Sequence, residues 1–212
     1  MKKYELTDET IEFYGRTLYR IRACRDFETI TGLKVKAGDL GGFVETEENL
    51  LHDGLCWVYD NAKVCDNAQV WGNAKVCGNA VVYGNAKVYN AADIFGNAEV
   101  FGDAVVYGYA EVYNAAEIFG NARVSGSAKI SGSAIIQTSQ DYIAISPIGS
   151  RNDVTTFYKT DSGIDVRCGC FNGSIEKFLK AVEETHGDNK YGKAYRAAAE
   201  LAKIQIEVNS ND

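Results

Sequence analysis

The chain has 212 residues, 46% of them apolar, which is enough to bury a substantial core in one to three small domains. A formal net charge of −7 argues against general affinity for nucleic acid or for anionic membranes. The charged start, Met1 to Asp8, lacks the apolar centre of a signal peptide, and no stretch is apolar enough to span a bilayer. We therefore expect a cytoplasmic protein whose six cysteines are reduced.

Residues 1–57 precede a long repeat and are predicted to cap it. Thr7 to Tyr14 is predicted to form a short helix, and Leu18 to Phe27 a strand with alternating apolar residues. Gly38 to Val44 is predicted to be a turn that leads into an irregular first coil. A cap is expected because the bare end of a β-helix would stack onto other chains.

Residues 58–138 carry a repeat of six residues without insertion. Val or Ile recurs at every sixth position from Val58 to Ile136, and an alanine stands four residues after each, from Ala62 to Ala134. β-Branched residues favour strands, and the Gly-Asn pairs between them favour tight corners. One unit cannot bury its apolar residue alone, so coils of three units must stack. The sequence predicts a mainly β protein built on a three-sided parallel β-helix.

The residue after each aliphatic position is often aromatic and should point outward. Taking every eighteenth residue places these rings in a vertical ladder on each face. Stacked rings can simply stabilise neighbouring coils, but exposed aromatic patches are also typical of interfaces. Val81 and Val105, at outer positions that are otherwise mostly charged, favour an interface. We expect a homo-oligomer whose contacts include Trp71, Tyr83, Tyr89, Phe95, Phe101, Tyr107, Tyr113 and Phe119.

Residues 139–212 are predicted to form a small α+β module of two strands and two helices. Val154–Lys159 and Ile164–Phe171 read as the strands. Ser174 is predicted to cap a helix that reaches about Thr185 and is closed by Gly187. The second helix is predicted to span Lys190 to Glu207.

This module carries the candidate ligand site. The predicted loop offers hydroxyl, amide and guanidinium groups, the strands add two cations, and the helix N-terminus offers free N–H groups. Together they suit a small anion, although an ordinary solvated hairpin would carry similar side chains. The candidate ligand-binding residues are Ser150, Arg151, Asn152, Lys159, Arg167 and Ser174.

Three residues of the C-terminal segment are candidate metal ligands. Cys168, Cys170 and His186 could supply three metal ligands, but structural zinc normally takes four, so buried thiols are favoured and no metal or cofactor is predicted. The chain has only two histidines, His52 and His186, and neither lies in the repeat. No catalytic residue is predicted.

Several segments point to a known group of proteins. Tyr19 to Ala23, Gly38 to Glu45, Glu48 to Leu50 and Cys56 to Ala62 together resemble uncharacterised hexapeptide-repeat proteins of phages, prophages and enteric bacteria. The repeat itself resembles that of bacterial hexapeptide transferases, which implies a left-handed β-helix and side-by-side homotrimers. Right-handed, bactofilin-like helices remain the alternative. The transferase resemblance also implies bound CoA and a histidine base.

The best interpretation is a non-catalytic oligomeric binding or assembly protein of phage or prophage origin. Its expected partners are further copies of itself and either a host protein or a small anionic, nucleotide-like ligand. Two alternatives stay open. One is an acyl-CoA-dependent acyltransferase, and the other is a protein that sequesters a nucleotide signal of host defence.

Overall fold

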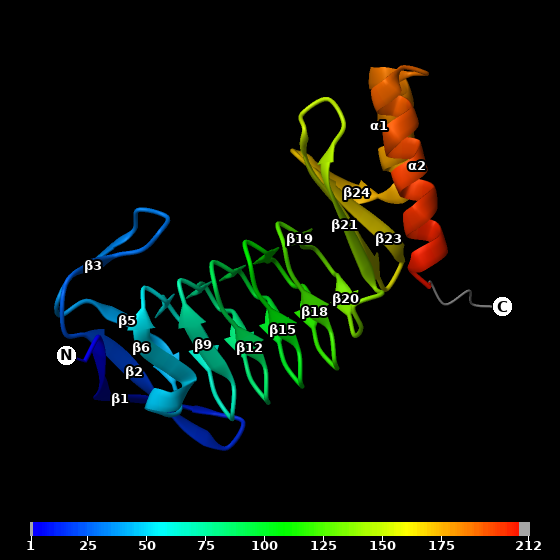
Figure 1. Ribbon diagram of the computed structural model, residues 1–212. Helices are drawn as coiled ribbons and strands as arrows, with labels where there is room; N and C mark the ends of the chain where they lie inside the picture. The colour runs from blue at the N-terminus through cyan, green and yellow to red at the C-terminus, as the bar shows by residue number, and fades with distance from the viewer. Residues whose placement is uncertain (1, 208–212) are drawn as a thin grey trace.

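The computed structural model describes residues 2–207, which form three parts along one axis (Figure 1). An N-terminal cap leads into a three-sided solenoid of short parallel strands, and a four-stranded sheet with two helices closes the far end. Within this range no helix is long and apolar enough to cross a membrane.

The solenoid strands stack into three sheets because each strand pairs in parallel with the strand 18 residues later. The first sheet contains β5 (Leu40–Val44), β8 (Lys63–Val64), β11 (Val81–Val82), β14 (Glu99–Val100), β17 (Glu117–Ile118) and β20 (Ile135–Ile136). The second contains β7 (Trp57–Val58), β10 (Lys75–Val76), β13 (Asp93–Ile94), β16 (Glu111–Val112) and β19 (Lys129–Ile130). The third contains β6 (Leu50–Gly54), β9 (Gln69–Gly72), β12 (Lys87–Val88), β15 (Val105–Val106) and β18 (Arg123–Val124).

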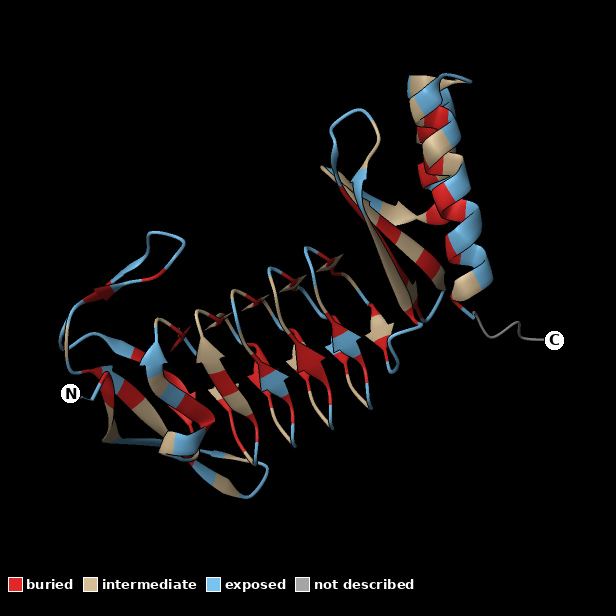
Figure 2. Ribbon diagram, in the orientation of Figure 1, coloured by how far each residue is buried: buried red, intermediate tan, exposed pale blue. Residues whose placement is uncertain are grey.

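The interior of the solenoid is built from two positions of the six-residue unit, the Val or Ile and the alanine. The Val or Ile at every sixth position from Val58 to Ile136 is 0% exposed, and the alanine at every sixth position from Ala62 to Ala134 is at most 1% exposed. Figure 2 shows this buried interior as the red bands of successive strands. The predicted three-sided parallel β-helix is confirmed, and it begins before residue 58, since β5 and β6 already pair with later coils.

The corners are held by side-chain stacks as well as by backbone bonds. Asn79 donates to Asn97 over 3.1 Å, and Asn67 donates to Asn85 over 3.1 Å. Asn85 in turn donates to Asp103 over 2.9 Å. The residue that begins each corner has positive φ and is usually glycine, as at Gly84 with φ of 70°.

The predicted aromatic ladders are present on all three sheets. Ring centroids of Trp71 and Tyr89 lie 4.5 Å apart at an interplanar angle of 8°, and those of Phe95 and Tyr113 lie 4.8 Å apart at 2°. The remaining stacked pairs are Tyr83–Phe101, Tyr89–Tyr107 and Phe101–Phe119. Each of these rings is half-buried in the single chain.

Two outer valines do not contribute the exposed apolar surface that the sequence suggested. Val81 is 8% exposed and Val105 is 9% exposed within one chain. Because their own neighbours already cover them, they give no support to an interface.

The cap begins with a hairpin of β1 (Tyr4–Phe13) and β2 (Arg16–Ala23), so the helix predicted over Thr7 to Tyr14 is wrong. Antiparallel pairing with β2 outweighs the local helical pattern, and Ile11 lies opposite Leu18. Tyr14 and Gly15 both take positive φ and close the hairpin. The strand predicted over Leu18 to Phe27 begins and ends earlier, and β2 joins β5 in the first sheet.

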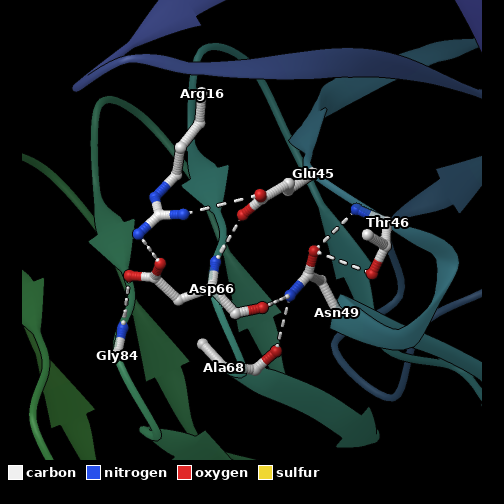
Figure 3. Close-up of polar contacts among 7 residues, drawn as sticks. All are labelled: Arg16, Glu45, Thr46, Asn49, Asp66, Ala68 and Gly84. Atoms are coloured by element: carbon white, nitrogen blue, oxygen red, sulfur yellow. Dashed lines mark hydrogen bonds and ion pairs between the residues drawn. The ribbon is translucent and has the colours of Figure 1, made fainter.

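A second, smaller hairpin projects from the cap. Its strands are β3 (Phe27–Glu28) and β4 (Lys34–Val35), and its loop extends away from the axis at the N-terminal end (Figure 1). The cap then passes through a 3-10 turn, Glu47–Asn49, into β6. The buried Asn49 side chain links this turn to the first coil (Figure 3).

The C-terminal module is a sheet in the order β21 (Tyr142–Ile148), β22 (Asp153–Thr160), β23 (Gly163–Cys168) and β24 (Phe171–Ser174). Helices α1 (Ile175–His186) and α2 (Lys190–Gln205) follow. The two predicted strands correspond to β22 and β23, and both helices and the caps at Ser174 and Gly187 are confirmed, but the sheet has two further strands that were not predicted. β21 escaped recognition because both of its faces are covered, so it lacks polar alternation.

One face of this sheet closes the open end of the solenoid, and the helices cover the other face. Tyr158 is fully buried in the solenoid core, and its hydroxyl lies 3.1 Å from that of Ser131. Thr156 accepts from the Lys129 amide over 3.0 Å. Phe157, between these two residues, points to the helices and packs against Phe178.

The Cys65 thiol makes the stability of the solenoid sensitive to alkaline pH. Burial, followed by the nearby carboxylates of Asp66 and Glu45, raises the pKa of Cys65 from 9.0 to about 12. The unfolded chain therefore loses this proton first, so stability is complete below pH 9 and falls as pH rises from 9 toward 12.

We expect wild type to lose about 2 kcal/mol more unfolding free energy between pH 8 and pH 10.5 than Cys65→Val. Urea titrations of both proteins at the two pH values measure this difference. Equal losses in the two proteins would contradict the assignment to Cys65, because tyrosine titration is common to both.

Candidate functional site

The C-terminal module has an open cavity of about 320 Å³ between the end of its sheet and its two helices. The turn between β21 and β22 contributes Ser150 and Arg151, and α2 contributes Tyr195. The remaining lining residues are Cys168, Cys170 and Phe171 of the β23–β24 hairpin and Phe178, Ala181, Val182, Thr185 and His186 of α1. We call this space the C-terminal cavity.

Two glycines shape its wall. A Cβ at Gly149 would lie 1.8 Å from the Tyr195 hydroxyl oxygen, so only glycine lets the turn and the tyrosine meet. A Cβ at Gly169 would lie 2.6 Å from Nη1 of Arg151, so the guanidinium rests on the bare backbone of the hairpin. Both glycines have positive φ, 71° and 58°. The turn geometry and the cavity lining therefore depend on each other.

The cavity is locally cationic in an acidic protein. Its lining contains the arginine Arg151 but neither Asp nor Glu. Arg151 makes no ion pair with any residue in the range 2–207, and its one side-chain hydrogen bond is a long one of 3.9 Å to Cys170 Sγ. A guanidinium without a carboxylate partner at the mouth of an apolar cavity is suited to bind an anion.

The inner wall holds a chain of polar side chains. Thr155 donates to Cys168 Sγ over 3.2 Å, and Cys168 Sγ lies 3.7 Å from the Tyr195 hydroxyl. Burial, with the hydrogen bond to Cys168, raises the pKa of Tyr195 to about 12. The phenol is therefore neutral at ordinary pH and available as a hydrogen-bond donor to a ligand.

The structure separates the six predicted ligand residues. Ser150 and Arg151 line the C-terminal cavity, and Asn152 lies beside them in the turn with φ of 53°. Lys159 instead pairs with Asp141 over 3.9 Å.

The other two predicted ligand residues face different surroundings. Arg167 lies on the strand face that holds Thr156 and Asn172, which covers the solenoid rather than the cavity. Ser174 accepts from the Lys177 amide at the start of α1, whereas the cavity is lined by the later part of that helix. The structure therefore places Lys159, Arg167 and Ser174 outside the cavity that Ser150 and Arg151 line.

Cys168, Cys170 and His186, weighed as metal ligands, do line this one cavity. Even so, no group of three His, Cys, Asp or Glu side chains within residues 2–207 is arranged to hold a metal ion. His186 packs against Tyr195 with ring centroids 5.7 Å apart. The imidazole thus forms part of the aromatic wall.

The other histidine lies at the opposite end of the molecule. His52 stacks on Tyr4 at 4.5 Å, its Nδ1 accepts from the Lys3 amide, and its Nε2 lies 3.4 Å from Glu47. Both ring nitrogens are thus engaged within the cap.

The solenoid also has a groove beneath the β3–β4 hairpin, formed by two adjoining hollows of about 520 and 280 Å³. The loop contributes Ile30, and the solenoid corners contribute Asn73, Ala91 and Tyr109. The repeat itself has no insertion that could form a loop over a coil, and the cap supplies the loop instead. The groove lining includes no histidine, so it offers no imidazole base for acyl transfer.

Sequence reasoning missed Tyr195, Phe171, Phe178 and Thr185 as lining residues. Tyr195 packs in the core of the module, and its hydroxyl also reaches the β21–β22 turn. The one signal in the sequence for these lining residues was the glycine in each of two turns, Gly149 and Gly169. A glycine in a turn can mark a place where a side chain from a distant segment approaches the backbone.

Comparison with known families supports the fold. A family model described as the YdcK beta solenoid repeat matches residues 116–132, which run from β17 through β19. The chain is a β-solenoid repeat protein. The match covers part of the solenoid and does not reach the C-terminal cavity. No curated protein matches the chain.

Proposed function

We propose that this protein is a non-catalytic binding protein that holds a small anionic ligand in the C-terminal cavity. One observation carries the proposal. In a chain of net charge −7, this cavity has an arginine free of ion pairs with any described residue and a lining without carboxylates. Its apolar walls suit a ligand with a planar or apolar body as well as an anionic group.

The size of the cavity limits the ligand to a small molecule. Phe171 and Tyr195 offer ring surfaces, Arg151 offers paired donors for phosphate or carboxylate oxygens, and Ser150 offers a hydroxyl. A nucleotide-like anion fits these requirements, and its sequestration is the role that best suits a phage or prophage protein. The cytoplasm is the proposed location, because all six cysteines are free thiols.

We also propose that the protein acts as a homo-oligomer, with the trimer as the expected state. Half-buried aromatic ladders on a rigid rod support this part of the proposal. Repeated copies would raise the number of ligand sites per particle without enlarging each chain.

The ligand proposal is tested on protein purified from cytosol. We expect native mass spectrometry to show bound mass of a few hundred daltons, or calorimetry to detect binding of nucleoside monophosphates or cyclic nucleotides. Arg151→Gln should weaken that binding about 30- to 100-fold, because a charge-assisted hydrogen-bond pair is lost.

Lys193→Gln is the matched control, since Lys193 is an exposed cation on α2 that lies outside the cavity. It should leave affinity unchanged. Protein that carries no ligand and binds neither inorganic phosphate nor any of these nucleotides would overturn the proposal, as would full affinity in Arg151→Gln.

A further inference from the structure

The charges on the three outer faces of the solenoid are not distributed alike. On the second sheet they neutralise one another, since Lys75 pairs with Asp93 over 2.7 Å and Lys129 pairs with Glu111 over 3.0 Å. The first and third sheets lack such internal pairs over most of their length. The unpaired charges of the third sheet are positive, whereas those on the later coils of the first sheet are negative.

The third sheet is aromatic and basic. Its outward strand positions are Gln69, Lys87, Val105 and Arg123, and its ladder is Trp71, Tyr89 and Tyr107. Neither Lys87 nor Arg123 forms an ion pair with any residue from 2 to 207, although the Arg123 guanidinium lies 6.0 Å from the Tyr107 ring centroid. This sheet faces the viewer along β9, β12, β15 and β18 in Figure 1, and no other segment crosses it there.

The first sheet is aromatic and acidic over its later coils. Glu99 and Glu117 occupy outward strand positions beside Phe101 and Phe119. Glu117 has no cation partner in the described chain, and Glu99 only accepts from the Tyr83 hydroxyl over 3.3 Å. The β1–β2 hairpin packs against Cys65 and Tyr83, so it covers the earlier coils of this sheet. The later coils, which carry Glu99 and Glu117, are left uncovered by the hairpin.

We propose that the third sheet of one copy docks on the acidic coils of the first sheet of a second copy. This inference deepens the oligomeric part of the proposed function. The occupant is a second copy because the chain itself carries the complementary surface, with matching aromatic ladders and opposite, unpaired charges. Charge complementarity of this kind selects partners and fixes register.

The register of the contact follows from the repeat. Glu117 and Arg123 are one six-residue unit apart and therefore lie on the same coil, at the same height along the axis. Two parallel copies set side by side at equal height place Glu117 of one opposite Arg123 of the next. Glu99 then lies one coil above Lys87 of its neighbour, a spacing of about 4.8 Å that long side chains span.

The contact is heterologous, because two different faces meet. Each added copy exposes the same unused pair of faces, so the assembly closes as a ring where the rotation between copies allows it and otherwise extends as a filament. Salt should weaken it, since both charge pairs lie at the surface of the rod.

Charge reversal tests the pairing. We expect Arg123→Glu and Glu117→Arg each to weaken association at least tenfold, as measured by native mass spectrometry and light scattering at low ionic strength. The double variant should recover association, because every chain then carries both reversed partners. Lys193→Glu and Glu48→Arg are matched controls at exposed positions outside both faces, and they should associate normally.

The outcomes separate the two levels of the proposal. A protein that is monomeric at every concentration overturns both the proposed oligomer and the assigned contact faces. Ligand binding by the C-terminal cavity is tested separately, by its own measurement. An oligomer that is insensitive to both single reversals overturns the assigned faces alone. Failure of the double variant to recover also overturns them, because it indicates that like faces meet.

Discussion

Asn49→Ala is expected to lower the free energy of unfolding by about 3 kcal/mol. The Asn49 side chain is 1% exposed, and its amide donates to the backbone oxygens of Asp66 over 3.0 Å and Ala68 over 2.9 Å (Figure 3). Its carbonyl oxygen accepts from the Thr46 amide over 2.8 Å. Alanine leaves these buried groups without partners at the junction of the cap and the first coil.

The surroundings of Asn49 make compensation difficult. Arg16 pairs with Asp66 and also approaches Glu45 within 3.6 Å, and Glu45 accepts from the Asp66 amide over 2.7 Å. These neighbouring groups are already engaged with one another. Loss of the Asn49 amide therefore cannot be repaired by a small shift of an existing donor.

Asn121→Ala provides the control for this prediction. Asn121 is an exposed corner asparagine of the same repeat, and its loss should cost less than about 0.5 kcal/mol. Urea unfolding of both variants beside wild type gives the comparison. A loss below 1 kcal/mol in Asn49→Ala would show that water or a rearranged cap satisfies the two carbonyl groups.

Gly149→Ala is expected to abolish ligand binding and to lower stability by about 3 kcal/mol. The added Cβ would lie 1.8 Å from the Tyr195 hydroxyl oxygen and 2.0 Å from Cζ, so the tyrosine or the turn must move. Either movement changes the position of Ser150 and Arg151 at the cavity mouth. Positive φ at residue 149 adds its own strain in alanine.

Gly132→Ala separates strain from collision. Gly132 has the same φ of 71°, but a Cβ there would meet no atom within 4 Å. We expect this variant to lose only about 1 kcal/mol and to bind ligand as wild type does. Equal effects of the two substitutions on stability and binding would mean that Tyr195 does not fix the turn.

The two predictions concern opposite ends of the rod and should be independent. Asn49 lies at the N-terminal cap, whereas Gly149 lies in the module that closes the far end. Asn49→Ala should therefore leave the affinity of the folded protein for its ligand unchanged. Calorimetry under conditions where the variant remains folded checks this.

The solenoid was predictable from the sequence because its information is local and repeated. Each six-residue unit contains its own inward aliphatic residue, its corner residues and its alanine. The spacing of 18 residues then sets the register of all three sheets. The start of α1 at Ser174 and its end at Gly187 were predictable for the same reason, since capping depends on neighbouring residues.

The C-terminal cavity was only partly predictable. Ser150 and Arg151 stood out as turn residues with anion-binding chemistry, and both line it. Arg167 has the same chemistry but faces the solenoid. One face of each strand covers the solenoid and the other faces the helices. The choice between them depends on how the whole sheet packs, and the sequence of a single strand does not determine it.

By itself, then, the sequence determined the three-sided coil, its buried residues and the aromatic ladders, because these follow from a short period repeated many times. Only the tertiary structure decided that Thr7 to Phe13 forms a strand, since its partner β2 supplies the pairing. Only the tertiary structure brought Tyr195 to Gly149, because contacts between distant segments depend on the packing of the complete module.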